Sequence, residues 1–428
     1  MSLLVFKKIP TRFQRPSMRL NLHDSLLLPF TVLFFLVLEV TISLSELGIA
    51  ALSYGVLAIV LASFVAMLVL VVRDREITRF GFVHFLFFFF FISVTLVSGT
   101  DIRNAIYNSV FVWLMLLVVR YYRDRIDMVM KCITVAFSVC VLINFAHLVT
   151  HPMMWLVRET KDDTGYLFGI NYNQMGCRMM VALAANALCM GRSRVWTIHF
   201  IVMAIIATAS LAMVGSMTSL SMIVVFLLFC LVPSSRLRKV GIYSLFTLFV
   251  LFQVFVVFNG RGLENNDLAV YLVEDVLHKD LTFTNRTSMW ESALDIISQS
   301  PLWGWGFPDA DWFRSNMASS AIGPHNFILS VLINGGIILL GVYLWICAVA
   351  VRTIWPYMNE RKAQLLVFAV ACLWFMSLME MYSYPIMFFP LIFMFYYPYL
   401  AAGKEPTGGT EAELASDDDD VQMEKGLG

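Results

Sequence analysis

Long apolar runs separated by short polar segments make up most of the chain. Each run is close to the length of about 17–25 residues with which an α-helix crosses the hydrocarbon core of a membrane. We therefore predict an all-α polytopic membrane protein with about twelve transmembrane helices. The predicted spans cover residues 25–45, 49–72, 80–98, 104–119, 127–149, 173–190, 195–214, 217–232, 240–258, 325–350, 362–380 and 384–401.

The composition supports this class and excludes others. Of the 428 residues, 59% are hydrophobic and 14% are charged, and no soluble domain of this length needs so many apolar residues. The formal net charge is zero, so no nucleic-acid partner is expected. The seven cysteines lie in or beside apolar runs without metal-ligand spacing, and no cleavable signal peptide is apparent. We predict no metal site and no cofactor.

Lys and Arg residues gather in every second loop between the predicted spans. Five lie in residues 1–24, and further groups lie in 73–79, 120–131, 192–194, 236–239 and 352–362. Because basic loops stay on the cytoplasmic side, both termini are predicted to be cytoplasmic. The predicted organisation is a basic N-terminus at 1–24, nine helices in 25–258 with an external loop at 150–172, a large external loop at 259–324, three helices in 325–401 and a disordered acidic cytoplasmic tail at 402–428.

The large external loop contains two segments with helix-like spacing of apolar residues and one polar face, residues 264–280 and 287–300. They are predicted to be short amphipathic helices on the membrane or over the bundle. The loop is either a solvated helix pair without a catalytic role or part of an active site. Its Asp309 and Asp311 form an Asp-x-Asp pair, but nucleotide sugars, which such pairs bind through a metal, are absent from the external side.

Four arginines on the predicted external side are candidates for binding an anionic substrate, because charges at a membrane are expensive unless they have a function. They are Arg178, Arg261, Arg286 and Arg314. Asn171 or Asn173 could cap the helix of Arg178, which would place this arginine roughly 7 Å from the external helix end. Its side chain would either snorkel to the interface or face the bundle and hold a lipid-linked phosphate through two nitrogens.

Arg286 precedes the second amphipathic segment, which Thr284 or Asn285 could cap. Trp290 follows one turn later, so one helix face could bind phosphate through the arginine and stack on a sugar through the indole ring. The alternative is a solvent-exposed loop arginine.

His325 follows Gly323 and Pro324, and a proline at the first helical position is a helix-start signal. We therefore expect His325 and Asn326 in the first turn of a membrane helix, at its external end. The N-terminus of a helix disfavours a protonated ring, so the imidazole could accept a proton from a sugar hydroxyl. The alternative is a structural histidine that bonds a neighbouring loop.

Two further sets of residues lie near or within the predicted spans. Glu39 and Glu380 could each pair with one of the arginines or be a protonated packing residue. Gly335, Gly336 and Gly341 would permit close packing of the helix that follows His325.

The order of these motifs resembles the O-antigen ligase and O-antigen polymerase superfamily. Its members show Arg-x-x-x-Trp, then Pro-x-x-Gly-x-Gly, then His-Asn before a glycine-containing helix. The matching residues are Arg286, Trp290, Pro301, Gly304, Gly306, His325 and Asn326. Asn173 and Gly176 match the Asn-x-x-Gly helix start of the family, and the resemblance covers mainly residues 165–341.

The resemblance implies a metal-independent glycosyltransferase with GT-C-like architecture. Its donor and acceptor would be undecaprenyl-pyrophosphate-linked glycans, with membrane lipid and a chain-length regulator as further partners. Arg286 would hold the pyrophosphate, and His325 would act near the acceptor hydroxyl. Substrate-binding candidates are Arg178, Arg261, Arg314, Trp290, Asn326 and Asn173. Family members often have an arginine where this chain has Met217, and Arg178 or Arg261 would supply that charge.

The preferred interpretation is a polymerase of the bacterial inner membrane, with its active site on the external side, that joins lipid-linked repeat units of O-antigen, capsule or exopolysaccharide. The nearest alternative is a ligase of the same family that transfers the glycan to lipid A-core or protein. A polysaccharide transporter or flippase also has about twelve spans, but it predicts short external loops and charges near the membrane midplane.

Overall fold

The described part of the chain is helical. The computed structural model describes residues 78–152, 172–259, 286–317 and 322–402, and the single positions 62, 65 and 69. Its elements are α3 (Arg79–Ser98), α4 (Ile102–Tyr121), η1 (Arg123–Arg125), α5 (Ile126–Thr150), α7 (Tyr172–Cys189), α8 (Arg194–Val214), α9 (Met217–Leu231), α10 (Ser235–Phe255), α12 (Arg286–Gln299), α13 (Ala310–Asn316), α14 (Phe327–Ile354), η4 (Trp355–Tyr357), α15 (Arg361–Met376) and α16 (Tyr384–Ala402).

Ten of the predicted spans, from 80–98 to 384–401, correspond to helices in the structure. Seven of these helices are long and apolar enough to cross a membrane: α3, α4, α5, α8, α10, α14 and α16. α9 and α15 are shorter, with 15 and 16 residues. These helices support an integral membrane protein. The predicted spans 25–45 and 49–72 lie outside the described residues apart from three positions, so the twelve-span count and the GT-C-like architecture stay predictions.

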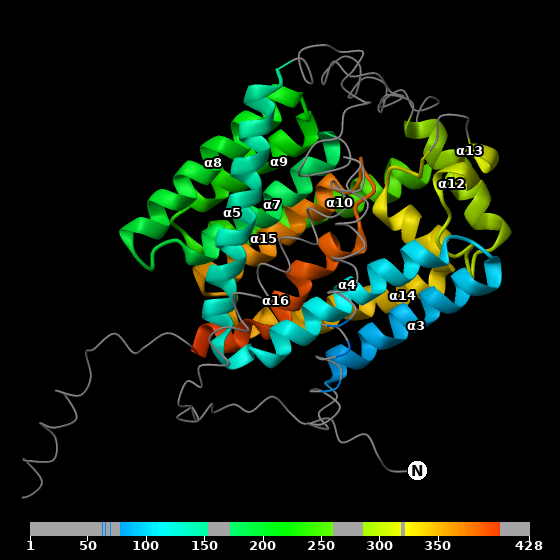
Figure 1. Cartoon of the computed structure of the whole chain (residues 1–428), viewed down its shortest axis with the longest axis horizontal. Helices are drawn as coiled ribbons and strands as arrows, with labels where there is room; N and C mark the ends of the chain where they lie inside the picture. The colour runs from blue at the N-terminus through cyan, green and yellow to red at the C-terminus, as the bar shows by residue number, and fades with distance from the viewer. Residues whose placement is uncertain are drawn as a thin grey trace, which may run out of the picture.

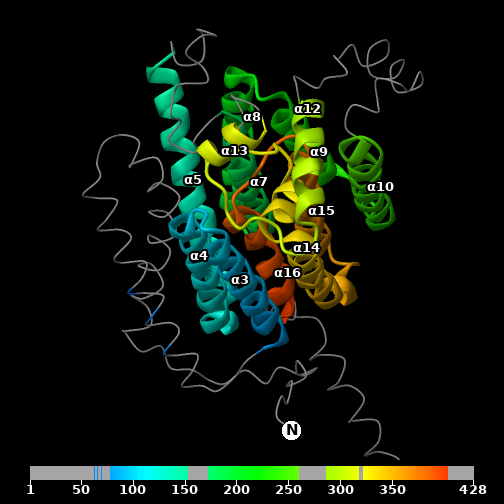
Figure 2. The same ribbon diagram turned by 90° about the vertical axis from the view of Figure 1, so that its right-hand side faces the viewer.

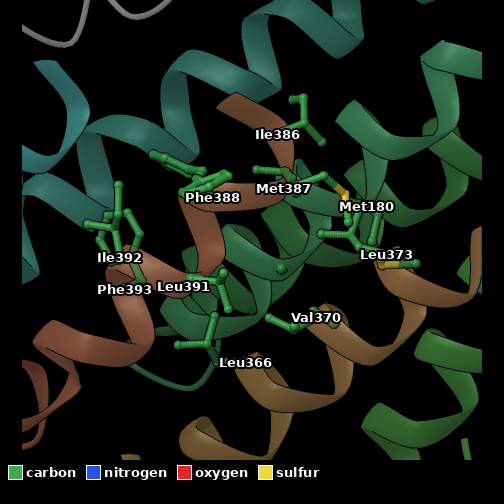
Figure 3. Close-up of a cluster of buried hydrophobic side chains, with 14 of the residues drawn as sticks. Met180, Leu366, Val370, Leu373, Ile386, Met387, Phe388, Leu391, Ile392 and Phe393 are labelled. Atoms are coloured by element: carbon green, nitrogen blue, oxygen red, sulfur yellow. The ribbon is translucent and has the colours of Figure 1, made fainter. Parts of the chain in front are cut away.

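α16 lies in the middle of the bundle and is buried along almost its whole length. It packs against α14, α4 and α15 and touches α7. Figure 3 shows side chains of α16 such as Met387 and Leu391 among Leu366 and Val370 of α15 and Met180 of α7. A helix that is apolar on every face is stable inside a protein core or a membrane, and α16 lies inside the bundle.

The helices run between two ends of the bundle, which we name after one residue each. The His325 end contains the start of α12, residues 322–326 before α14, and the loop from α15 to α16, residues 377–383. The Arg238 end contains the turn from α9 to α10, η4 and the start of α15. α12 and α13 lie together at the His325 end, beside the tip of the α3–α4 hairpin (Figures 1 and 2).

α14 is broken near the His325 end at two glycines. Gly335 has φ −158° and ψ 20°, and Gly336 has φ 62° and ψ −161°, neither of which is helical. The segment 301–306 supplies backbone hydrogen bonds at the break. These bonds run from Trp305 N to Ile333 O (2.6 Å), from Gly306 N to Asn334 O (3.1 Å) and from Ile337 N to Pro301 O (2.9 Å). Irregular backbone at a membrane is tolerated where other backbone satisfies it in this way.

Glycine is required on both sides of this contact. A Cβ on Gly304, whose φ is +70°, would lie 2.5 Å from the carbonyl oxygen of Ile333. The predicted role of the helix glycines in close helix packing is therefore wrong: Gly335 and Gly336 admit a loop, and a Cβ on Gly341 would meet no atom within 4 Å. The Pro-x-x-Gly-x-Gly motif has a structural role here, because it occupies the break in α14.

Candidate functional site

Arg286 is the first residue of α12, and its side chain reaches the loop 377–383. Its Nε donates a hydrogen bond to the carbonyl oxygen of Met379 at 2.8 Å. Its Nη2 lies 3.9 Å from Oε2 of Glu380, and its side chain is 22% exposed. The guanidinium is thus held by the loop while part of it stays accessible. The predicted capping residues Thr284 and Asn285 lie outside the described residues.

His325 lies before α14 and not in its first turn, which corrects the prediction. α14 starts at Phe327, so the ring of His325 lies outside the first turn of this helix. The backbone of His325 has φ +44°, and it is the only non-glycine residue with positive φ in the described ranges. This conformation costs about 1–3 kcal/mol, persists only where the surroundings impose it, and is enriched at functional sites.

Asn326 is the N-cap of α14 and is fully buried. Its side-chain oxygen accepts a hydrogen bond from Leu329 N at 3.0 Å, and its amide nitrogen donates to Gln253 at 2.9 Å and to the carbonyl oxygen of Leu378 at 3.3 Å. The side chain is thus engaged by the protein, and the geometry supports a structural role for Asn326 and not the predicted contact with substrate.

Glu380 joins Arg286 to His325. Its Oε1 lies 3.0 Å from Nδ1 of His325 and accepts a hydrogen bond from Met381 N at 3.2 Å. Its Oε2 faces Arg286, and its side chain is only 6% exposed. Three segments that are far apart in the sequence therefore meet at one carboxylate. Together they provide a cation, a proton-transfer group and a buried anion.

Tyr382 follows in the same loop and links the site to the helices beneath it. Burial raises the pKa of this phenol well above its usual value, and the nearby Cys177 and Glu380 raise it further. A hydrogen bond with Ser219 and the charge of Arg286 act in the opposite direction. The phenol therefore stays protonated at neutral pH, and Tyr382 is suited to hydrogen bonding and not to proton abstraction.

Arg178 is buried in α7, so its side chain faces the bundle and does not snorkel to an interface. Its Nη1 donates to the carbonyl oxygen of Gln174 at 3.3 Å. Two residues earlier, Gly176 packs so closely against Ser219 of α9 that a Cβ would overlap with the serine side chain. Met217, at the start of α9, is exposed and has no part in this contact. Phosphate binding by Arg178 stays a prediction.

Two other predicted residues have structural partners. Trp290 is fully buried in a cluster with Phe249 and Leu329, so the geometry gives no support to stacking on a sugar. Arg314 lies in α13, and its Nη1 bonds Asp311 at 2.6 Å on the same helix.

For Asn173 and Arg261, contact with substrate stays a prediction. Asn173 lies in the first turn of α7, which begins at Tyr172, and Arg261 lies outside the described residues. Asp309 caps α13 by accepting a hydrogen bond from Trp312 N at 2.8 Å. The Asp-x-Asp pair is thus explained by helix capping and an ion pair. In the described part of the chain, no group of three or more His, Cys, Asp or Glu side chains could hold a metal ion.

Pairing of Glu380 with an arginine was one of two interpretations left open by the sequence, whereas its contact with His325 was not predicted and Tyr382 was not identified. Both lie in a loop that the sequence pattern assigned largely to the span 362–380, whereas α15 ends at Met376. The available signal was the carboxylate itself, because an ionisable residue at the edge of a predicted span is a candidate for function.

Comparison with protein families supports the resemblance found in the sequence. Residues 200–344, about one third of the chain, match the family model described as O-antigen ligase. The match includes Arg286 and His325 but ends before Glu380. No curated protein and no solved structure matches the chain. The family match confirms the predicted resemblance and supports the assignment of this chain to the O-antigen ligase and O-antigen polymerase superfamily.

Proposed function

We propose that this chain is a polymerase that joins undecaprenyl-pyrophosphate-linked oligosaccharide repeat units in the synthesis of O-antigen, capsule or exopolysaccharide. The family match supports the broader class of O-antigen ligases and polymerases. The structural observation behind the proposal is that Arg286, Glu380 and His325 meet at one end of the bundle. An arginine suits an anionic leaving group, and a histidine paired with a carboxylate suits proton transfer.

In the proposed reaction, a hydroxyl of the acceptor sugar attacks the anomeric carbon of the donor glycan. The bond between that carbon and the pyrophosphate oxygen breaks, and undecaprenyl pyrophosphate leaves with the electron pair. His325 accepts the hydroxyl proton at Nε2, and Arg286 stabilises the charge that develops on the pyrophosphate. Because the donor is already activated, the proposed step involves neither a nucleotide nor a metal ion.

We place the His325 end on the external side of a bacterial inner membrane and both termini in the cytoplasm. The Arg238 end contains the basic segments 236–239 and 352–362. Loops rich in Lys and Arg stay in the cytoplasm, so this distribution supports the proposed orientation. A lipid-linked glycan on the external face would then reach the constellation directly.

A ligase is the second candidate, because the matching family model is described as O-antigen ligase. It would use the same donor chemistry with lipid A-core or protein as acceptor. Deletion of the gene distinguishes the two, since loss of a polymerase leaves single repeat units and loss of a ligase leaves long unattached polymer.

Reconstitution tests the proposal directly. The purified protein in proteoliposomes receives synthetic undecaprenyl-pyrophosphate-linked repeat units, alone or with a lipid A-core acceptor, and with or without EDTA. We expect a ladder of longer glycans and release of undecaprenyl pyrophosphate in both conditions. Transfer to a lipid A-core acceptor without chain extension would support the ligase instead. Movement of the donor across a bilayer without a new glycosidic bond would support the transporter and contradict an enzyme.

A further inference from the structure

Glu380 is the most buried of the three residues that meet at the candidate site, Arg286, Glu380 and His325. Its side chain is 6% exposed, whereas those of His325 and Arg286 are 20% and 22% exposed. A substrate that enters the site therefore meets the imidazole and the guanidinium before it can reach the carboxylate. This arrangement favours a residue that acts through its neighbours over one that contacts the reacting atoms.

The hydrogen bonds of Glu380 decide how the imidazole is held. Oε1 lies 3.0 Å from Nδ1 of His325, and the backbone N–H of Met381 donates to the same oxygen at 3.2 Å. Arg286 beside Glu380 favours the carboxylate form, whose oxygens only accept hydrogen bonds, so in this arrangement Nδ1 is the donor and carries a proton. In the neutral ring Nε2 is then the nitrogen that can accept a proton.

The second oxygen of the carboxylate is directed to the arginine. Oε2 accepts no hydrogen bond from the described residues, and the Nη2 of Arg286 at 3.9 Å is too distant for one. A buried carboxylate is costly unless a positive charge lies nearby. Arg286 supplies that charge while its Nε is anchored on Met379, the residue before Glu380. One loop thus sets the positions of both groups.

We propose that Glu380 is a positioning residue for glycosyl transfer. It holds His325 with Nδ1 protonated and Nε2 available to the acceptor hydroxyl, and it keeps the guanidinium of Arg286 beside the same site. The kinetic consequence of this inference rests on the proposed function, whereas the tautomer of the ring does not.

Nitrogen NMR of histidine-labelled protein tests the tautomer without any substrate. The signals of His325 are identified by their loss in His325→Gln. At a pH where the ring is neutral, we expect Nδ1 to be protonated in the wild type. Glu380→Met keeps the volume of the side chain but has no acceptor oxygen, so Nε2 should become the protonated nitrogen. Glu380→Gln is the matched control and should keep the wild-type tautomer, because Met381 N–H holds its oxygen in place.

Steady-state kinetics of glycan extension test the catalytic consequence. We expect Glu380→Met to lower kcat by ~100-fold and to leave the KM for the donor nearly unchanged. Glu380→Gln should lower kcat much less. If Glu380→Met does not fold, Glu380→Ala replaces it in both experiments. The inference would be overturned if Glu380→Met, or Glu380→Ala in its place, kept the wild-type tautomer of His325 or the wild-type kcat per folded molecule. Absence of transfer by the wild type would contradict only the proposed function, since the tautomer still tests Glu380.

Discussion

Arginines lie at both ends of the helix bundle, and their partners differ. At the Arg238 end, Arg238 is buried, with Nε 2.5 Å from Gln364 and Nη1 2.6 Å from the carbonyl oxygen of Val232. Arg361 donates to the carbonyl oxygen of Cys230 at 2.6 Å. The last carbonyl groups of a helix have no partner within it, so these two arginines satisfy the end of α9 and join it to α10 and α15.

At the His325 end, Arg286 donates to the backbone carbonyl of Met379 and faces the carboxylate of Glu380 at a longer distance. That carboxylate also binds a histidine whose backbone is in an unfavourable conformation. Residue type alone does not distinguish these arginines. An arginine whose guanidinium nitrogens bind carbonyl oxygens at a helix end is thus a structural arginine. A partly exposed arginine beside a glutamate–histidine pair is a candidate for binding a ligand.

The largest effect is expected from removal of the two accessible groups of the His325 end. His325→Ala removes the proposed proton acceptor, and Arg286→Ala removes the cation proposed to lie beside the leaving pyrophosphate. We expect each variant to lower the rate of glycan extension by ~100-fold or more. Membrane levels should stay close to wild type, which immunoblots of the membrane fraction can measure.

Arg286→Lys is the matched control, because it keeps the charge but not the two-nitrogen geometry. An intermediate rate is expected for it. If either alanine variant extended glycans at the wild-type rate, the role assigned to that residue would be wrong, and the contrast between the two ends would not concern catalysis.

The next effect is expected at the contact that fixes the shape of the His325 end. Gly304→Ala forces a Cβ against the carbonyl oxygen of Ile333 and places alanine at φ +70°. We expect a loss of about 3 kcal/mol, seen as less folded protein in fluorescence-detected size exclusion. Gly341→Ala is the matched control, since a Cβ there meets no atom within 4 Å. Equal yields for the two variants would contradict the proposed docking of the segment 301–306.

The positions of the helices could be predicted from the sequence because each apolar run matches the thickness of a membrane. The break in α14 could not, because Gly335 and Gly336 lie inside a continuous apolar run and glycine is common in membrane helices. Their non-helical backbone depends on a segment some 30 residues earlier that supplies the hydrogen bonds. Such a contact leaves no periodic signal.

The candidate site was predictable in part. Arg286 and His325 were identified from their residue types and the family resemblance, but the link between them depends on Glu380, which is 55 residues beyond His325. Trp290 has the spacing of a stacking residue and is instead a packing residue, because the side chain fills the core between α12 and α14. Local spacing does not determine which side of an amphipathic helix is covered.

A moderate effect on stability, with little effect on chemistry, is expected at the Arg238 end. Arg238→Ala leaves buried carbonyl groups and Gln364 without their partner, at a cost of about 2 kcal/mol. We expect the apparent Tm of the purified protein to fall by about 2 °C, while the extension rate per folded molecule stays near wild type. Arg238→Lys keeps the charge but fewer hydrogen bonds, so its Tm should lie between those of the wild type and Arg238→Ala. A large loss of extension rate in Arg238→Ala at an unchanged Tm would show that Arg238 is not a structural arginine.

The smallest effect is expected at Arg314, although it belongs to the same predicted external loop as Arg286. Its partner Asp311 lies three residues earlier on α13, and both side chains are well exposed. Such a pair contributes about 0.5 kcal/mol or less to stability. Arg314→Ala should therefore change the equilibrium constant of unfolding by less than ~2-fold, which leaves the Tm nearly unchanged, and it should change the extension rate by less than ~2-fold. Asp311→Asn should do the same. Arg314→Ala could instead lower the extension rate as strongly as Arg286→Ala. In that case the intramolecular partners of an arginine would not identify it as a substrate-binding residue, and its accessibility to the substrate would be the deciding property.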